Sequence, residues 1–164
     1  MKKIYLAGPD VFEPDAAAIG QMYKQQCLQH GFTGLYPLDN EIKSTDDKKQ
    51  MAQAIFKANI KLIEKSDIVI ANLNPFRGKE PDSGTVWECG YAFAIGKKVY
   101  GYKKDLKPYI DTFDKKEKTE KDSLTYDGNG TIIEDFDYPA NLMIACTTQI
   151  FDGELEDVLK AIKI

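Results

Sequence analysis

Apolar and polar positions follow two different periods along the chain, one typical of buried strands and one of amphipathic helices. Short apolar runs predict five strands, at residues 3–7, 32–38, 67–73, 98–102 and 148–151. Apolar residues three and four positions apart predict helices between them, at residues 14–30, 50–65, 84–95, 139–146 and 153–162. Strands that alternate with helices form a parallel sheet covered on both faces. The predicted fold is therefore a three-layer α/β/α sandwich, and five strands fit the flavodoxin-like, doubly wound order 2-1-3-4-5.

Residues 103–138 interrupt this pattern. They contain many Lys, Asp and Glu residues and few branched aliphatic ones. Connections of about 35 residues are uncommon in compact domains and are usually functional or disordered. We therefore expect one domain over residues 1–164, with a charged insert at 103–138 and a shorter polar loop at 39–49.

Composition narrows the class of protein. The chain has 164 residues, 43% of them hydrophobic and 29% charged, which is typical of a soluble globular domain with one core. Its net charge of -4 disfavours a nucleic-acid polymer as partner, because such domains usually carry a basic face. No apolar run approaches the roughly 18 residues of a membrane span, and the apolar N-terminal stretch is too short for a signal peptide. A cytoplasmic protein without membrane contact is expected.

Cysteine and histidine usage argues against several kinds of catalytic site. Cys27, Cys89 and Cys146 are widely spaced in apolar or helical stretches, which predicts buried free thiols in a reducing compartment. The single histidine, His30, lies at the end of a predicted helix and before Gly31. One histidine disfavours a Ser/His or Cys/His relay and a zinc site. We therefore expect no metal and no cofactor.

The predicted topology indicates where a ligand would bind. In open α/β sheets ligands bind beyond the carboxyl ends of the strands, which here carry residues 8–12, 72–83 and the start of the insert. The first of these turns, Gly-Pro-Asp-Val-Phe, lacks both the dinucleotide fingerprint and a P-loop lysine. It also adds the negative charge of Asp10. This environment suits a neutral sugar better than a phosphate.

Two carboxylates lie six residues apart near the predicted helix at 84–95. Asp82 lies in the loop before this helix, and Glu88 lies in its first turns, on one face with Thr85 and Tyr91. The helix N-terminus stabilises a carboxylate anion, which favours Glu88 as a nucleophile over an acid with a raised pKa. Two structural explanations stay open: a capping box between Thr85 and Glu88, and a solvated loop position for Asp82.

Four further residues are candidates for substrate contact, each with a structural alternative. Asn59 lies on the helix before the central strand, where a solvent-facing amide is the alternative. Tyr5 lies in the first strand and is otherwise a core aromatic. Phe12 and Trp87 lie near the expected cleft and are otherwise core residues.

Together these segments resemble the nucleoside 2-deoxyribosyltransferase family. The resemblance is carried by residues 3–9, 66–71, 82–92 and 141–144 and covers nearly the whole chain apart from the insert. Its most specific part is Asp-x-Gly-x-x-x-Glu-x-Gly-Tyr, which begins at Asp82. The resemblance implies a flavodoxin-like fold and a homo-oligomer whose active sites are shared between subunits. It implies a 2'-deoxynucleoside and a nucleobase as small-molecule partners.

The resemblance also implies roles for individual residues. Glu88 would be the nucleophile, Tyr5 would orient it, and Asp82 would contact the base and assist proton transfer. Asn141 would reach the sugar 5'-hydroxyl in a neighbouring subunit's site, and Met143 would line the same pocket, although a helix start explains both equally well. The remaining substrate-contact positions are expected at Gly8, Pro9, Phe12, Asn59, Ser83, Gly84 and Trp87.

The chain departs from the family pattern at two places. Lactobacillary members carry an aspartate where this chain has Asn59, and an amide binds without supplying a charge. Those members also end in an aromatic tail that helps to close the site, whereas a helix is expected here at 154–164. The charged insert is then the candidate lid. Both departures bear on substrate range rather than on reaction type.

The implied chemistry is that of a retaining glycosidase, in which a carboxylate attacks the anomeric carbon and forms an ester. A second base or water then resolves the ester. One alternative is a 2'-deoxynucleoside 5'-monophosphate N-glycosidase, for which Arg77 and Ser83 are the evident phosphate contacts. The other is a non-catalytic nucleoside-binding module, which would not require Glu88. The sequence does not determine whether the base is a purine or a pyrimidine, or whether the deoxyribosyl group is transferred to a base or to water.

Overall fold

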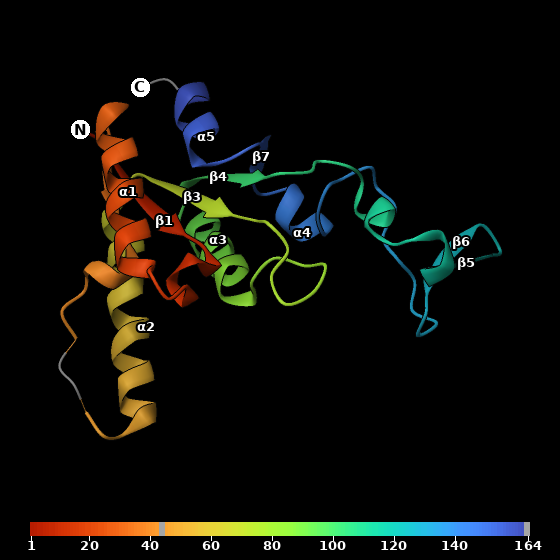
Figure 1. The fold of residues 1–164 in the computed structure, drawn as a ribbon, viewed down its shortest axis with the longest axis horizontal. Coiled ribbons are helices and arrows are strands. Elements are labelled where there is room, and N and C mark those ends of the chain that lie inside the picture. The colour runs from red at the N-terminus through yellow and green to blue at the C-terminus, as the bar shows by residue number, and fades with distance from the viewer. Residues whose placement is uncertain (43–44, 163–164) are drawn as a thin grey trace.

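A parallel five-stranded sheet forms the centre of the molecule (Figure 1). The computed structural model describes residues 1–42 and 45–162. The sheet has the order β2-β1-β3-β4-β7. Its strands are β1 (Lys3–Ala7), β2 (Thr33–Leu35), β3 (Ile68–Asn72), β4 (Lys98–Lys103) and β7 (Gln149–Asp152). Counted along the chain within the sheet, this is the order 2-1-3-4-5, so the expected flavodoxin-like fold is confirmed.

Helices cover both faces of the sheet and complete the three layers. Their bounds are α1 (Ala16–Gln29), α2 (Lys48–Lys65), α3 (Ser83–Ala94), α4 (Leu142–Ala145) and α5 (Leu155–Ala161). Cys27 of α1 and Val158 of α5 pack in one apolar cluster with the sheet, whereas Ile63 of α2 and Cys89 of α3 pack in the other. Figure 1 shows α5 and α3 on opposite sides of the sheet.

Strand β1 contributes to both clusters. Because successive side chains of a strand point to opposite faces, Ile4 and Leu6 pack under α1 and α5, whereas Tyr5 and Ala7 face α2 and α3. In the sheet, Tyr5 lies opposite Val69 of β3. The sequence thus directs the Tyr5 side chain to the face that α3 covers.

Two element boundaries differ from the expected ones, because a proline ends one element early and a capping residue starts another earlier. The second strand is shorter than residues 32–38, because a 3₁₀ turn over Pro37–Asp39 follows it and proline has no N–H for the ladder. Helix α2 begins before residue 50, because the Asp47 side chain accepts hydrogen bonds from two backbone N–H groups of its first turn.

The C-terminal helices are also shorter than expected. Helix α4 is a single turn rather than residues 139–146, because Asn141 caps its first turn by accepting from the Met143 N–H. Helix α5 ends at Ala161. The last two residues of the helix expected at 154–164 lie outside the described residues, as do residues 43–44 of the loop expected at 39–49.

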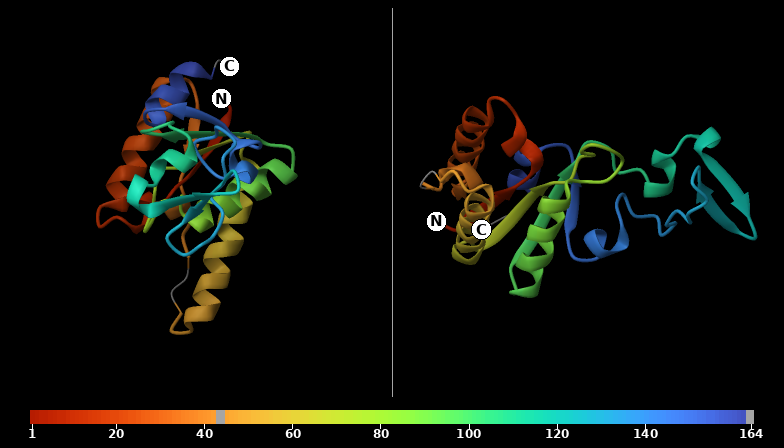
Figure 2. Two further views of the ribbon diagram at one scale, coloured as in Figure 1. Left: turned by 90° about the vertical axis from the view of Figure 1, so that its right-hand side faces the viewer. Right: turned by 90° about the horizontal axis from the view of Figure 1, so that it is seen from below.

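The insert at 103–138 contains regular structure that its composition did not predict. An antiparallel hairpin pairs β5 (Lys118–Lys121) with β6 (Leu124–Asp127). The two residues between these strands, Asp122 and Ser123, have φ of 52° and 65°, as a type I′ hairpin turn requires. Figure 2 shows the hairpin extending away from the sheet as an arm. The charged composition of the insert did not indicate this hairpin.

No helix within residues 1–42 and 45–162 is long and apolar enough to cross a bilayer. In the same residues, no group of three His, Cys, Asp or Glu side chains is placed to hold a metal ion. Cys27 and Cys89 are buried as expected, but Cys146 is exposed, because its single-turn helix buries only Ile144.

Candidate active site

A short hydrogen bond joins the first strand to helix α3. The Tyr5 hydroxyl donates to Oε1 of Glu88 at 2.6 Å. Tyr5 has no exposed surface, so its ring packs in the core while its hydroxyl reaches the carboxylate. Tyr5 is therefore both a core aromatic residue and a hydrogen-bond partner of Glu88.

Burial controls the protonation of Glu88. Desolvation raises the pKa of this carboxyl to about 7, with the Tyr5 hydrogen bond acting against the rise and the negative charge of Asp82 adding to it. The expectation of an anion held by the helix N-terminus, without a raised pKa, is therefore wrong. Glu88 lies beyond the first turn of α3, where the effect of the helix dipole has fallen off.

Asp82 is the N-cap of α3. Its Oδ2 accepts from the Thr85 backbone N–H at 2.8 Å and from the Thr85 hydroxyl at 3.0 Å. Thr85 therefore pairs with Asp82 and not with Glu88, which rules out the capping box proposed for Glu88. The helix begins at Ser83, one residue before the expected start, and Ser83 is exposed.

Glu88 lines a cavity of about 360 Å³ between α2 and α3. The cavity is lined by Phe56, Asn59, Ile60, Ile63, Gly84, Trp87 and Glu88. The structure thus brings four of the candidate residues together here: Asn59, Gly84, Trp87 and Glu88. Asn59 lies in the cavity wall rather than in open solvent, and its Oδ1 accepts from the Asn40 amide at 3.4 Å.

Aromatic rings form one wall of this cavity. Trp87 packs edge-on against Phe56, with ring centroids 5.6 Å apart, and stacks on Tyr91 at 5.5 Å. Trp87 is 49% exposed, so it is not a core residue. Stacked rings at an open cavity offer a flat surface suited to a planar base. Phe56 was missed in the sequence, although its i, i+3 spacing with Asn59 places both on one helix face.

The turn after β1 lies apart from this cavity. Gly8 precedes a 3₁₀ turn over Pro9–Phe12, and none of these residues lines the Glu88 cavity. Phe12 is exposed and stacks on Phe76 at 5.5 Å, with the Arg77 guanidinium over both rings. The structure therefore does not bring Gly8, Pro9 or Phe12 together with Glu88 in one cavity.

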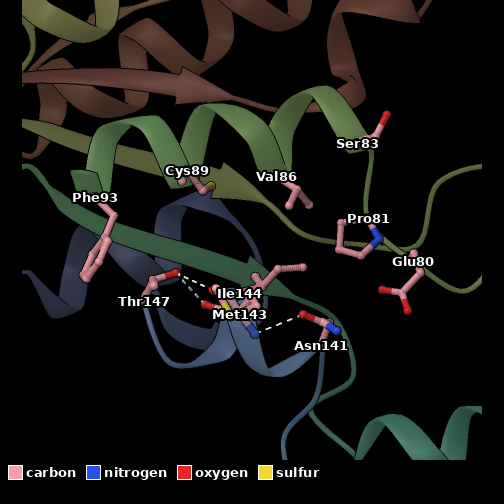
Figure 3. A pocket seen from close by; sticks show the side chains of 11 residues that line it. Glu80, Pro81, Ser83, Val86, Cys89, Phe93, Asn141, Met143, Ile144 and Thr147 are labelled. Atoms are coloured by element: carbon pink, nitrogen blue, oxygen red, sulfur yellow. Dashed lines mark hydrogen bonds between the residues drawn. The ribbon is translucent and has the colours of Figure 1, made fainter. Parts of the chain in front are cut away.

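Three other candidates line a second cavity, of about 540 Å³, on the other side of α3. Figure 3 shows Val86 and Cys89 of α3 facing the short helix α4 across it. Its lining includes Ser83, Asn141 and Met143. Within one chain these residues do not lie in the Glu88 cavity.

Asn141 and Met143 differ in their surroundings. Asn141 caps α4 and its amide donates to Oε1 of Glu134 at 2.6 Å, so the helix-start explanation describes its contacts in one chain. Met143 is 69% exposed at the edge of the second cavity. Most of the Met143 side chain is therefore left uncovered by its own chain.

Fold and site together define a class of protein: a flavodoxin-like α/β protein with a half-buried, hydrogen-bonded carboxyl in an aromatic-walled cavity. The sequence model described as nucleoside 2-deoxyribosyltransferase matches residues 4–143. The chain belongs to the nucleoside 2-deoxyribosyltransferase family.

Two solved structures described as 2-deoxyribosyltransferases, and one uncharacterized protein, are similar to this chain. A solved 2-desoxiribosyltransferase from Leishmania mexicana is 34% identical, with a TM-score of 0.77, and the match covers 98% of this chain and 95% of that one. A 2-deoxyribosyltransferase from Bacillus psychrosaccharolyticus is 25% identical, with a TM-score of 0.51, over 62% of this chain and 72% of that one. An uncharacterized protein of Schizosaccharomyces pombe is 32% identical over 109 residues, 65% of this chain and 52% of that protein. The chain therefore spans about half the length of this curated relative.

Proposed function

We propose that this protein cleaves the N-glycosidic bond of 2'-deoxyribonucleosides and transfers the deoxyribosyl group to another nucleobase. The observation that carries the proposal is the hydrogen bond from Tyr5 to Glu88 at the wall of an aromatic-lined cavity. A half-buried carboxyl beside a surface for a planar base provides the two parts that this reaction needs: a nucleophile and a place for the base. Membership of the family supports the same activity.

In the proposed mechanism ionised Glu88 attacks the anomeric carbon of the sugar. The bond from that carbon to the base nitrogen breaks, and its electron pair leaves with the base, which takes up a proton. The carboxylate oxygen forms an ester with the deoxyribosyl group through an oxocarbenium-like transition state. A second base then displaces Glu88 by the reverse steps. With a pKa of about 7, Glu88 is ionised in roughly half of the molecules at neutral pH.

Tyr5 and Asp82 support Glu88 in different ways. Tyr5 fixes one carboxylate oxygen and leaves the other for attack. Asp82 uses Oδ2 to cap α3, and among the described residues its Oδ1 accepts no hydrogen bond. That oxygen can exchange a proton with the base. The effect of Asp82 on the Glu88 pKa indicates that the two carboxyls interact.

The protein is proposed to act as a homo-oligomer with shared sites. Asn59, Trp87 and Glu88 are the cavity-lining side chains that can form hydrogen bonds, which leaves few partners for the hydroxyls of a sugar. Met143 and Phe93, 69% and 54% exposed, lie at the apolar second cavity. Large exposed apolar groups beside a cavity are typical of an interaction surface. A second copy seated there would bring Asn141 and Met143 to its Glu88 cavity.

The test is incubation with 2'-deoxyinosine and free adenine, followed by chromatography. We expect 2'-deoxyadenosine from the unmodified protein and none from Glu88→Ala. Glu120→Ala, in the hairpin arm, is the matched control and should retain activity. Release of hypoxanthine without formation of a new nucleoside would show that the protein is a hydrolase rather than a transferase. Reaction only with a 5'-monophosphate would favour the nucleotide N-glycosidase instead.

A further inference from the structure

A small cavity lined by lysines lies at the carboxyl ends of β3 and β4. Its volume is about 300 Å³, and it shares no lining residue with the Glu88 cavity. Its charged lining residues are Lys79, Lys103, Lys104, Lys107 and Asp105. The lining itself thus holds four lysines and one aspartate, and further carboxylates, Glu117 and Glu154, pair with two of the lysines from outside the lining.

Lys103 is the unusual member of this group. It is only 4% exposed, and its ammonium donates to the Pro139 carbonyl at 2.6 Å. Within residues 1–42 and 45–162 no carboxylate lies within 4.0 Å of it; Asp105 and Glu80 act from farther away. Burial lowers the pKa of Lys103. A buried cation without a close counter-ion is costly, and an anion in the adjoining cavity would offset that cost.

The other three lysines each form an ion pair at the surface, and the Lys79 ammonium also donates to the Thr112 carbonyl at 2.9 Å. Lys104 pairs with Glu154 at 3.1 Å, and both side chains are more than two-thirds exposed. Lys79 pairs with Glu117 at 3.1 Å, and Lys107 with Asp105 at 2.9 Å. Exposed pairs contribute about 0 to 1 kcal/mol, so a multiply charged anion can compete for these ammonium groups.

We propose that this cavity binds a phosphate group, either as free phosphate or as the phosphoryl group of a nucleotide. Four lysines that line a space of about 300 Å³ can supply ammonium donors to a compact, doubly charged oxyanion, which has acceptors on all sides. The site is separate from the Glu88 cavity, and its existence does not depend on the proposed catalytic role of Glu88.

Calorimetric titration tests the proposal, with inorganic phosphate and with a 2'-deoxynucleoside 5'-monophosphate at constant ionic strength. The variants are Lys103→Met, Lys107→Gln and the control Lys61→Gln, which changes an exposed lysine of α2. We expect saturable binding that Lys103→Met and Lys107→Gln each weaken roughly tenfold and Lys61→Gln leaves unchanged. Lys107→Gln keeps the test valid if the buried substitution impairs folding.

Competition identifies the source of the phosphate group. Binding of inorganic phosphate supports a site for the free anion. If only the nucleotide binds, and the 2'-deoxynucleoside does not compete with it, the site is a nucleotide site. Either kind of binding should persist in Glu88→Ala. Absence of saturable binding, equal weakening by Lys61→Gln, or competition by the unphosphorylated nucleoside would overturn a separate site. Loss of base exchange with phosphate binding intact would instead count only against the catalytic proposal.

Discussion

At Glu88 burial and hydrogen bonding act on one carboxyl in opposite directions. Desolvation raises its pKa, whereas the hydrogen bond from Tyr5 favours the ionised form, and the balance is a pKa of about 7. A buried carboxylate is a stronger nucleophile than a solvated one, but its ionised form destabilises the folded chain. Stability and reactivity therefore oppose each other at this residue.

This opposition gives a prediction for Glu88→Gln. A carboxyl whose pKa rises from 4.5 to about 7 on folding takes up protons, so its destabilising effect appears as pH rises through that range and is absent below it. We expect Glu88→Gln to raise the free energy of unfolding by about 1 to 3 kcal/mol near pH 8 and to have little effect near pH 4. Urea denaturation at both pH values measures it. An equal effect at both values would contradict the assigned pKa.

Removal of the Tyr5 hydroxyl should move the pH profile upward. In Tyr5→Phe the ionised form of Glu88 loses its donor, so its pKa rises and the ionised fraction at neutral pH falls. We expect the acid limb of kcat against pH to shift to higher pH, with kcat near pH 7 lower by roughly tenfold. Tyr126→Phe, in the hairpin arm, is the control. A fall in kcat with an unshifted limb would mean that Tyr5 does not act through the Glu88 pKa.

At the scale of elements, Asp82 has two roles: it caps helix α3, and it is proposed to transfer a proton to the base. Two substitutions distinguish these roles. Asp82→Asn keeps a side-chain oxygen for the Thr85 N–H, so we expect unfolding to change by less than about 0.5 kcal/mol. Its kcat should still fall by roughly 10²- to 10⁴-fold, because an amide does not transfer the proton. Asp82→Ala should add a loss of about 1 kcal/mol in stability. Full activity in Asp82→Asn would restrict Asp82 to capping.

The close packing of α1 against Tyr36 gives a second prediction at this scale. A Cβ at Gly20 would lie 2.4 Å from the Tyr36 ring, whereas one at Gly90 of α3 would meet nothing within 4 Å. Gly20→Ala should destabilise the fold by about 1 to 3 kcal/mol. Gly90→Ala should instead stabilise it by about 0.5 to 1 kcal/mol, because alanine loses less entropy in a helix. Thermal unfolding of both variants tests the packing, and equal stability would contradict it.

The sequence predicted the elements with strong hydrophobic periodicity and missed those held by polar contacts. All five sheet strands were found, and the most strongly apolar of these runs, β3, is buried along almost its whole length. The β5–β6 hairpin was missed, because strands such as Lys118–Lys121 are polar throughout and only their turn geometry marks them. The raised pKa of Glu88 could not be predicted either, since it depends on how deeply α2 and α3 bury the side chain.

For the whole molecule, the exposed position of Met143, beside the α4 cap Asn141, is the feature that one chain leaves unexplained. Both residues line a cavity on the opposite side of α3 from Trp87 and Asn59. If a second copy covers this face, Met143→Asp should lower the oligomeric state measured by light scattering and reduce base exchange in parallel. Leu28→Asp, at a position on α1 that is 60% exposed, should change neither. If Met143→Asp leaves the oligomeric state unchanged, the face around Met143 is not the subunit interface.

The proposed covalent intermediate is tested most directly by trapping it. The protein is mixed with a 2'-deoxynucleoside without an acceptor base, quenched with acid within one turnover, digested, and analysed by mass spectrometry. We predict a deoxyribosyl adduct on the peptide that contains Glu88, lost when adenine is added before the quench and absent in Glu88→Gln. An adduct on another residue, or base exchange with no adduct at any time, would contradict Glu88 as the nucleophile.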